Sequence, residues 1–144
     1  MKTSIKKMEL TLARCLHEAV RGCAKNPLLI FSGCPETTQL AARVVMKLGY
    51  EPVVVRGKAR TAEGPMVHHI WVEIPELDLR VETNPSQIFG VPAFAMVLAT
   101  EDFEDRYFPE VEDPGFLERV TKAGERFYSK LADKVVRCVR AGRG

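Results

Sequence analysis

Apolar residues recur every three to four positions in three stretches of the chain, which is the spacing of amphipathic helices. These stretches predict helices over about residues 8–24, 35–48 and 114–140. Pro27 follows the first stretch and Gly49 follows the second, and both residue types are common where helices end. Helices are therefore expected near both ends of the sequence.

Between the second and third helices, short runs rich in valine and isoleucine are separated by turn residues, a pattern typical of strands. The predicted strands cover residues 52–56, 66–74, 79–83 and 93–99. Gly57 is expected to end the first strand, residues 75–78 to form a tight turn, and residues 58–65 and 101–113 to form loops. Because short connections favour antiparallel pairing, this order predicts an α+β fold rather than a wound parallel sheet.

The size and composition of the chain are those of one globular domain covering residues 1–144. The sequence is 46% hydrophobic and 28% charged, and its net charge of +2 indicates no particular class of partner. No apolar run reaches the ~20 residues of a membrane span, and no signal-peptide apolar region follows the basic N-terminal residues. We therefore expect a cytoplasmic protein without a membrane partner. Its oligomeric state does not follow from the sequence.

Cys34 is the first candidate for chemistry, because it stands where the second predicted helix begins. Unpaired N–H groups and the positive end of the helix dipole favour a thiolate at such a position. The other cysteines, Cys15, Cys23 and Cys138, fall on predicted helices among apolar residues, and the chain has no C-x-x-C pair. We interpret these three as small buried apolar side chains.

A histidine and a carboxylate are expected to meet on the predicted central hairpin. Strand alternation puts His69 and Glu82 on the same polar face, opposite or diagonal to each other, while His68 points to the apolar side. Asp78 is a rival carboxylate, but it lies about four residues along the hairpin from Glu82, roughly 13 Å away. Glu82 is therefore the preferred partner of His69, and Trp71 is expected to pack beside the site.

Three segments between residues 33 and 90 resemble parts of a known enzyme core in their order and spacing. They are Gly33–Gly57, with a cysteine before a helix and a strand after it; His69–Trp71, with histidine two residues before tryptophan; and Val81–Gln87, with an acid five residues before glutamine. Together they resemble the nucleophile helix, the histidine strand and the acid segment of the transglutaminase-like superfamily.

This resemblance implies a papain-like core, in which a helix carrying the thiol packs on an antiparallel sheet carrying the histidine and the acid. The N- and C-terminal helices would flank it. Carried over by position, Cys34 is the nucleophile, His69 the general base and Glu82 the carboxylate that orients the histidine. The thiolate would attack an amide or ester carbonyl to form a thioester, which water or an amine would then resolve. The expected function is a small cysteine hydrolase or acyltransferase acting on an amide or isopeptide bond of a peptide or protein, with no cofactor and no metal.

Two features depart from the family's pattern. The family usually has an aspartate where this chain has the longer Glu82. The chain also has no clear upstream glutamine or tryptophan to donate a hydrogen bond to an oxyanion. The backbone N–H of Cys34 can supply one such donor, and Asn26 is a candidate for another.

Other functions fit parts of the sequence. A catalytically inactive relative could bind a peptide or protein in the same groove. Zinc binding by Cys34, His68 and His69 is disfavoured, because adjacent strand residues point to opposite faces. Basic residues on the last predicted helix could grip nucleic-acid phosphates, but acidic residues interrupt them and no aromatic residues interleave, so we favour a solvated face. These basic residues are Arg119, Lys122, Arg126, Lys130 and Arg137.

Overall fold

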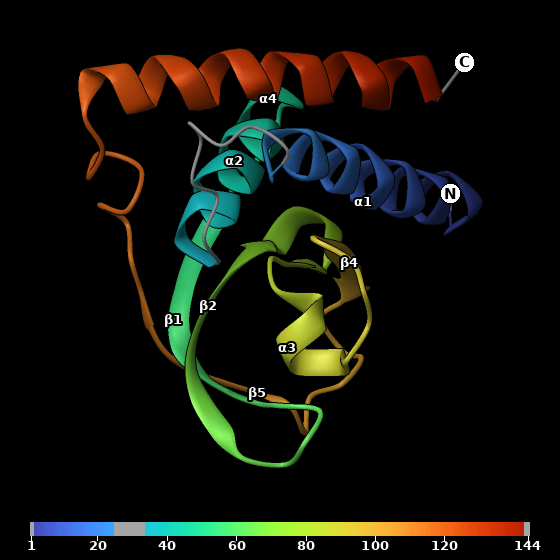
Figure 1. The fold of residues 1–144 in the computed structure, drawn as a ribbon. Coiled ribbons are helices and arrows are strands. Elements are labelled where there is room, and N and C mark those ends of the chain that lie inside the picture. Colours follow the sequence, from blue (N-terminus) through green and yellow to red (C-terminus); the bar gives the residue numbers. More distant parts are fainter. Residues whose placement is uncertain (1, 25–33, 143–144) are drawn as a thin grey trace.

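The computed structural model describes residues 2–24 and 34–142, which form an α+β fold as the sequence predicts (Figure 1). The α-helices are α1 (Lys2–Ala24), α2 (Cys34–Lys47), α3 (Pro85–Phe89) and α4 (Lys122–Gly142). The strands are β1 (Val53–Arg60), β2 (Met66–Ile74), β3 (Leu79–Glu82), β4 (Met96–Ala99) and β5 (Tyr107–Glu112), and a 3₁₀ turn, η1 (Pro75–Leu77), joins β2 to β3. Within the described residues, the predicted helices and strands occur in the expected order, with one additional strand, β5, and one additional short helix, α3.

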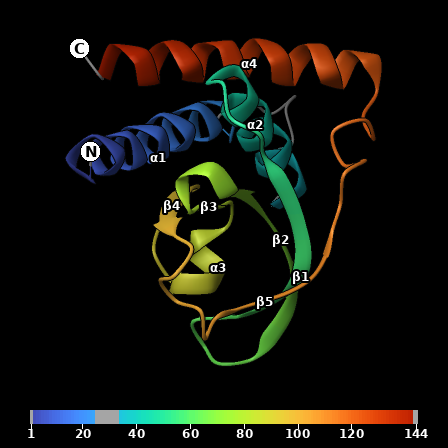
Figure 2. The same cartoon turned by 180° about the vertical axis from the view of Figure 1, so that it is seen from behind.

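The five strands form one antiparallel sheet in the order β4-β3-β2-β1-β5. The long strands β1 and β2 bend strongly, so that the sheet curls on itself (Figures 1 and 2). Helices α1, α2 and α4 gather on one side of the sheet, and α3 lies inside the curve of the strands. The sheet therefore has a helix-covered face and an inner face.

Strand alternation divides the buried side chains between these two faces. Ile70 and Val72 of β2 and Val81 of β3 belong to the main core, which they share with the helices. Trp71 and Tyr107 belong to a second, smaller core on the inner face. The face that the sequence predicts to be polar is therefore buried as well, and its polar side chains must find partners inside the protein.

The boundaries of β1 and β5 correct two expectations. Gly57 does not end β1, because the strand continues to Arg60 and pairs with β5 on its far side, with a break in register between Arg56 and Gly57. A Cβ atom on Gly57 would lie 2.3 Å from the backbone oxygen of Phe108, so only glycine lets β5 approach this closely. The segment 101–113, predicted to be an acidic loop, contains β5 itself.

The helix boundaries also differ from the expected ones. Helix α1 begins earlier than predicted, at Lys2, and α4 begins later, at Lys122. Arg119, expected on the last helix, lies before it and pairs with Asp113, which also accepts a 2.6 Å hydrogen bond from Arg56. Helix α4 packs across both α1 and α2 (Figure 1).

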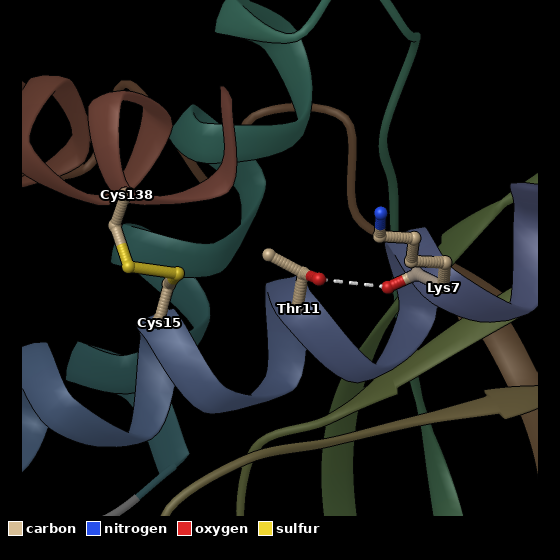
Figure 3. Close-up of a disulfide and its surroundings, with 4 residues drawn as sticks. All are labelled: Lys7, Thr11, Cys15 and Cys138. Carbon is tan, nitrogen blue, oxygen red and sulfur yellow. Dashed lines mark hydrogen bonds between the residues drawn. A yellow bond between two sulfur atoms is a disulfide. The ribbon is translucent and has the colours of Figure 1, made fainter. Parts of the chain in front are cut away.

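Cys15 is buried in the main core and Cys138 packs against it, as the sequence predicts, but the two are not separate side chains. These two residues, 123 positions apart, form a disulfide that joins α1 to α4 (Figure 3). One turn before Cys15, the hydroxyl of Thr11 donates a 2.8 Å hydrogen bond to the carbonyl oxygen of Lys7. The side chain of Cys23 lies outside the described part of the chain. Among the described residues, no helix is long and apolar enough to cross a membrane.

Candidate active site

His69 and Glu82 meet on the inner face of the sheet, as the hairpin predicts. The Nε2 atom of His69 lies 2.8 Å from Oε1 and 3.0 Å from Oε2 of Glu82. In the register of β2 and β3, Val72 lies opposite Val81. Continuing this register by one residue puts Trp71 opposite Glu82. His69, two residues before Trp71, is then a diagonal neighbour of Glu82. The predicted proximity of the two side chains is confirmed.

Glu82 is fully buried and its carboxylate is surrounded by donors. Its side chain is 0% exposed and that of His69 only 1%. The hydroxyl of Tyr107 donates to Oε1 at 2.7 Å, and the backbone N–H of Asn84 donates to Oε2 at 2.5 Å. A buried carboxylate is costly unless hydrogen bonds replace its hydration, and here both oxygens are satisfied.

Contact with this carboxylate also affects Tyr107. Burial raises the pKa of the Tyr107 phenol well above its ordinary value, and the negative charge of Glu82 and the hydrogen bond to it act in the same direction. The phenol therefore stays protonated at neutral pH and acts as a donor.

A second layer of contacts fixes the residues around the pair. The ring of Trp71 stacks on that of His69 with 5.9 Å between centroids, as expected of a packing residue beside the site. Trp71 Nε1 and Arg80 Nη2 both donate to Glu73 Oε1, at 3.3 and 3.2 Å. The guanidinium carbon of Arg80 lies 4.1 Å from the ring centroid of Tyr107, within the range of a cation–π contact.

A pocket of about 460 Å³ opens beside His69. Its walls come from three adjacent strands, from the first turn of α2 and from α3. The lining residues are Pro35, Arg56, Gly57, His68, His69, Ile70, Gln87, Glu110 and Val111. His68 is exposed and lines this pocket, so it is not buried on the apolar side of the hairpin as expected.

Cys34 is the first residue of α2, which confirms the predicted helix start, but its side chain lies outside the described part of the structure. Its neighbour Pro35 lines the pocket that His69 lines. One turn along α2, the hydroxyl of Thr38 lies 3.0 Å from that of Thr83, the residue that follows Glu82. The start of α2 is therefore held close to the His69–Glu82 pair.

The hydrogen bonds to Glu82 indicate the tautomer of His69. In the neutral ring, Nε2 carries the hydrogen, because it faces carboxylate oxygens that accept, and Nδ1 carries the lone pair. Nδ1 is then the atom able to take a proton from a substrate or a neighbouring thiol. The arrangement is that of a histidine base oriented by an acid.

The structure also places the remaining candidates. Asp78 caps η1 in a left-handed conformation and takes no part in the contacts to His69 described above, so its rejection holds. Gln87 lines the pocket and accepts a 3.1 Å hydrogen bond from the Asn84 side chain. Asn26, the second candidate oxyanion donor, lies outside the described residues. No cluster of three or more His, Cys, Asp or Glu side chains able to hold a metal occurs among the residues described.

Sequence reasoning missed Tyr107 and Arg80 as parts of this site. Tyr107 lies in the segment interpreted as an acidic loop, so its contact with Glu82 required knowledge of β5. Arg80 lies two residues before Glu82 on β3, but its position over the Tyr107 ring depends on the same strand β5.

Comparisons of this chain with protein-family models, with curated proteins and with solved structures find no match. The resemblance to the transglutaminase-like superfamily therefore stays a prediction, and the function is argued below from the residues themselves.

Proposed function

We propose that this protein is a small cysteine hydrolase or acyltransferase of transglutaminase-like type, acting on an amide or isopeptide bond. The observation that carries the proposal is the buried contact between His69 and Glu82 beside a pocket that the first turn of α2 also lines. In this proposal Cys34 is the nucleophile, His69 the general base and Glu82 the carboxylate that orients it. A peptide or protein is the proposed substrate, and the papain-like core is part of the same proposal.

The reaction would begin with a proton transfer from the Cys34 thiol to Nδ1 of His69, giving a thiolate and an imidazolium. The thiolate attacks the carbonyl carbon of the substrate. The C–N bond then breaks, the leaving amine takes the proton from the imidazolium, and a thioester remains on Cys34. Water, or an amine in the case of transfer, gives up a proton to His69 as it attacks the thioester, and the thiol is released.

The site offers means of stabilising both charges that develop in this reaction. Glu82 faces the imidazolium, and its own charge is held by the Tyr107 hydroxyl and the Asn84 N–H. The first N–H groups of a helix have no partner within the helix, so the backbone N–H of Cys34 at the start of α2 is the proposed oxyanion donor.

The proposal is tested by the pH dependence of Cys34 alkylation with iodoacetamide. An activated Cys34 should react at pH values well below the ~8.5 of an ordinary thiol. Replacing His69 with alanine should lower the rate at about pH 6.5 by 10- to 100-fold, because the thiolate then has no imidazolium partner. Mass spectrometry of the peptides reads the labelling of Cys34 separately from that of the other cysteines.

The chain supplies a matched control in the adjacent residue. His68 lines the same pocket but is exposed and on the opposite side of the strand from Glu82, so His68→Ala should leave the alkylation profile unchanged. Equal reactivity of the wild-type protein and His69→Ala would refute the activation of Cys34. It would instead favour a catalytically inactive protein that binds a peptide in this pocket.

A further inference from the structure

The hydroxyl of Tyr107 contacts the same carboxylate as His69. It donates a 2.7 Å hydrogen bond to Oε1, the oxygen that also lies 2.8 Å from Nε2 of His69. The other oxygen, Oε2, accepts the backbone N–H of Asn84. One tyrosine, one histidine and one backbone group thus determine where a single carboxylate points.

Glu82 has a particular need for such a constraint. A glutamate has one more rotatable bond than an aspartate, so its carboxylate can occupy more positions relative to an imidazole. The Glu82 side chain is 0% exposed, so solvent does not reach it and its oxygens depend on these donors for hydrogen bonds. The donors that hold Glu82 therefore help to fix the orientation of His69.

Contacts of its backbone and its ring hold Tyr107 in place beside Glu82. Its backbone pairs with Ala59 of β1, and its ring meets the edge of Trp71 at 5.2 Å between centroids. The guanidinium carbon of Arg80 lies 4.1 Å from the ring centroid of Tyr107, and Arg80 donates a hydrogen bond to Glu73. A cation over the ring draws electron density from the phenol and strengthens the hydroxyl as a donor.

We propose that Tyr107 is a positioning residue of the active site, which acts through Glu82 to hold His69 in the orientation and tautomer that a base for Cys34 requires. This inference rests on the proposed function. It adds a fourth side chain, contributed by strand β5, to the three that the sequence suggests.

The test is the variant Tyr107→Phe, which keeps the ring and its contacts and removes only the hydroxyl. We expect alkylation of Cys34 at about pH 6.5 to slow roughly tenfold, with the acid limb of the profile moving toward that of an ordinary thiol. Rates above about pH 9, where ordinary thiols ionise, should be unchanged. Tyr50→Phe is the matched control, because Tyr50 packs against the helix-side core, away from Glu82.

A double-mutant cycle shows whether Tyr107 acts through Glu82. If it does, adding Tyr107→Phe to Glu82→Gln should change the alkylation rate by less than twofold, because the group it supports is already neutral. A full tenfold loss in the Glu82→Gln background would overturn the inference, as would an unchanged profile in the single variant.

Nitrogen-15 NMR of the His69 ring separates this inference from the proposed function, because it does not require a reactive thiol. In a Cys34→Ala background, where no thiol can protonate the ring, the neutral His69 ring should show the Nε2–H tautomer, and adding Tyr107→Phe should give a mixture of tautomers. If Cys34 reacts like an ordinary thiol but the His69 tautomer still changes in Tyr107→Phe, the proposed function is refuted and the effect of Tyr107 on His69 stands. An unchanged His69 spectrum would overturn the inference.

A measurement on the wild-type protein covers the case in which Tyr107→Phe fails to fold. A hydroxyl that donates to a buried carboxylate exchanges slowly with water, so its proton should be visible by NMR and close in space to the Glu82 side chain. The absence of such a signal would count against the proposal.

Discussion

Glu82 is the residue that best distinguishes this site from ordinary structure. A fully buried carboxylate adds little net stability even when it is paired, because its desolvation offsets much of the interaction. An apolar residue at this position would pack without that cost. A buried carboxylate that contacts a histidine beside a pocket is instead what general acid–base chemistry requires.

The raised pKa of Tyr107 makes a prediction about stability at alkaline pH. Because the folded protein keeps the phenolic proton more tightly than the unfolded chain, the contribution of Tyr107 is complete below about pH 10 and is lost as the pH rises above it. The loss should be about 1.4 kcal/mol per pH unit while the native phenol stays protonated. Urea unfolding of the wild-type protein and Tyr107→Phe should therefore give free energies that converge above about pH 10. A constant difference between the two proteins from pH 9 to 11 would contradict this prediction.

The pairing of His69 with Glu82 could be predicted from the sequence because it depends only on local rules. A short turn fixes the register of the hairpin, and alternation fixes the face. The contact of Tyr107 with Glu82 could not be predicted in this way, since 25 residues separate the two and their meeting depends on how the sheet curls. Local patterns thus pair His69 with Glu82, and only the tertiary fold adds Tyr107.

At the scale of the elements, strand β5 connects the site to the rest of the sheet. It carries Tyr107 to the inner face and Glu110 and Val111 to the wall of the pocket. The sequence concealed this strand because the segment holds many charges and a proline, Pro109, both of which are typical of loops. An edge strand tolerates both, because one side of it has no neighbouring strand to satisfy.

Gly57 allows the backbone of β5 to approach β1 closely, because it has no Cβ atom. In Gly57→Ala the new Cβ atom would stand 2.3 Å from the backbone oxygen of Phe108 and 2.9 Å from Cα of Pro109, so the backbone of β5 must move. We expect a loss of about 1–3 kcal/mol in the free energy of unfolding, measured with urea, and a slower alkylation of Cys34 as Tyr107 is displaced.

Gly22→Ala is the control for this substitution. Gly22 is an exposed residue of α1 with nothing within 4 Å of an added Cβ atom, so alanine there should raise stability by about 0.5–1 kcal/mol. A Gly57→Ala protein as stable as the wild type would show that β5 adjusts without cost.

On the scale of the whole molecule, the three long helices form one layer over the sheet, and the disulfide between Cys15 and Cys138 ties its first helix to its last. The sequence could not reveal this pairing, because cysteine spacing alone does not fix connectivity and both residues fit an apolar helix face. Disulfides are more typical of oxidising compartments than of the cytoplasm, so the bond does not support the cytoplasmic location, which stays a prediction.

The disulfide closes most of the chain into one loop, and we expect it to stabilise the folded protein chiefly by restricting the unfolded chain. Reduction should lower the free energy of unfolding by about 2–4 kcal/mol, measured by urea denaturation with and without dithiothreitol. The double variant Cys15→Ala with Cys138→Ala should be destabilised to a similar degree and should no longer respond to dithiothreitol. If the oxidised and reduced wild-type proteins unfold at the same urea concentration, α1 and α4 are held together by their packing alone. Because α4 also packs on α2, alkylation of Cys34 in the reduced protein reports whether loosening the helix layer reaches the start of α2.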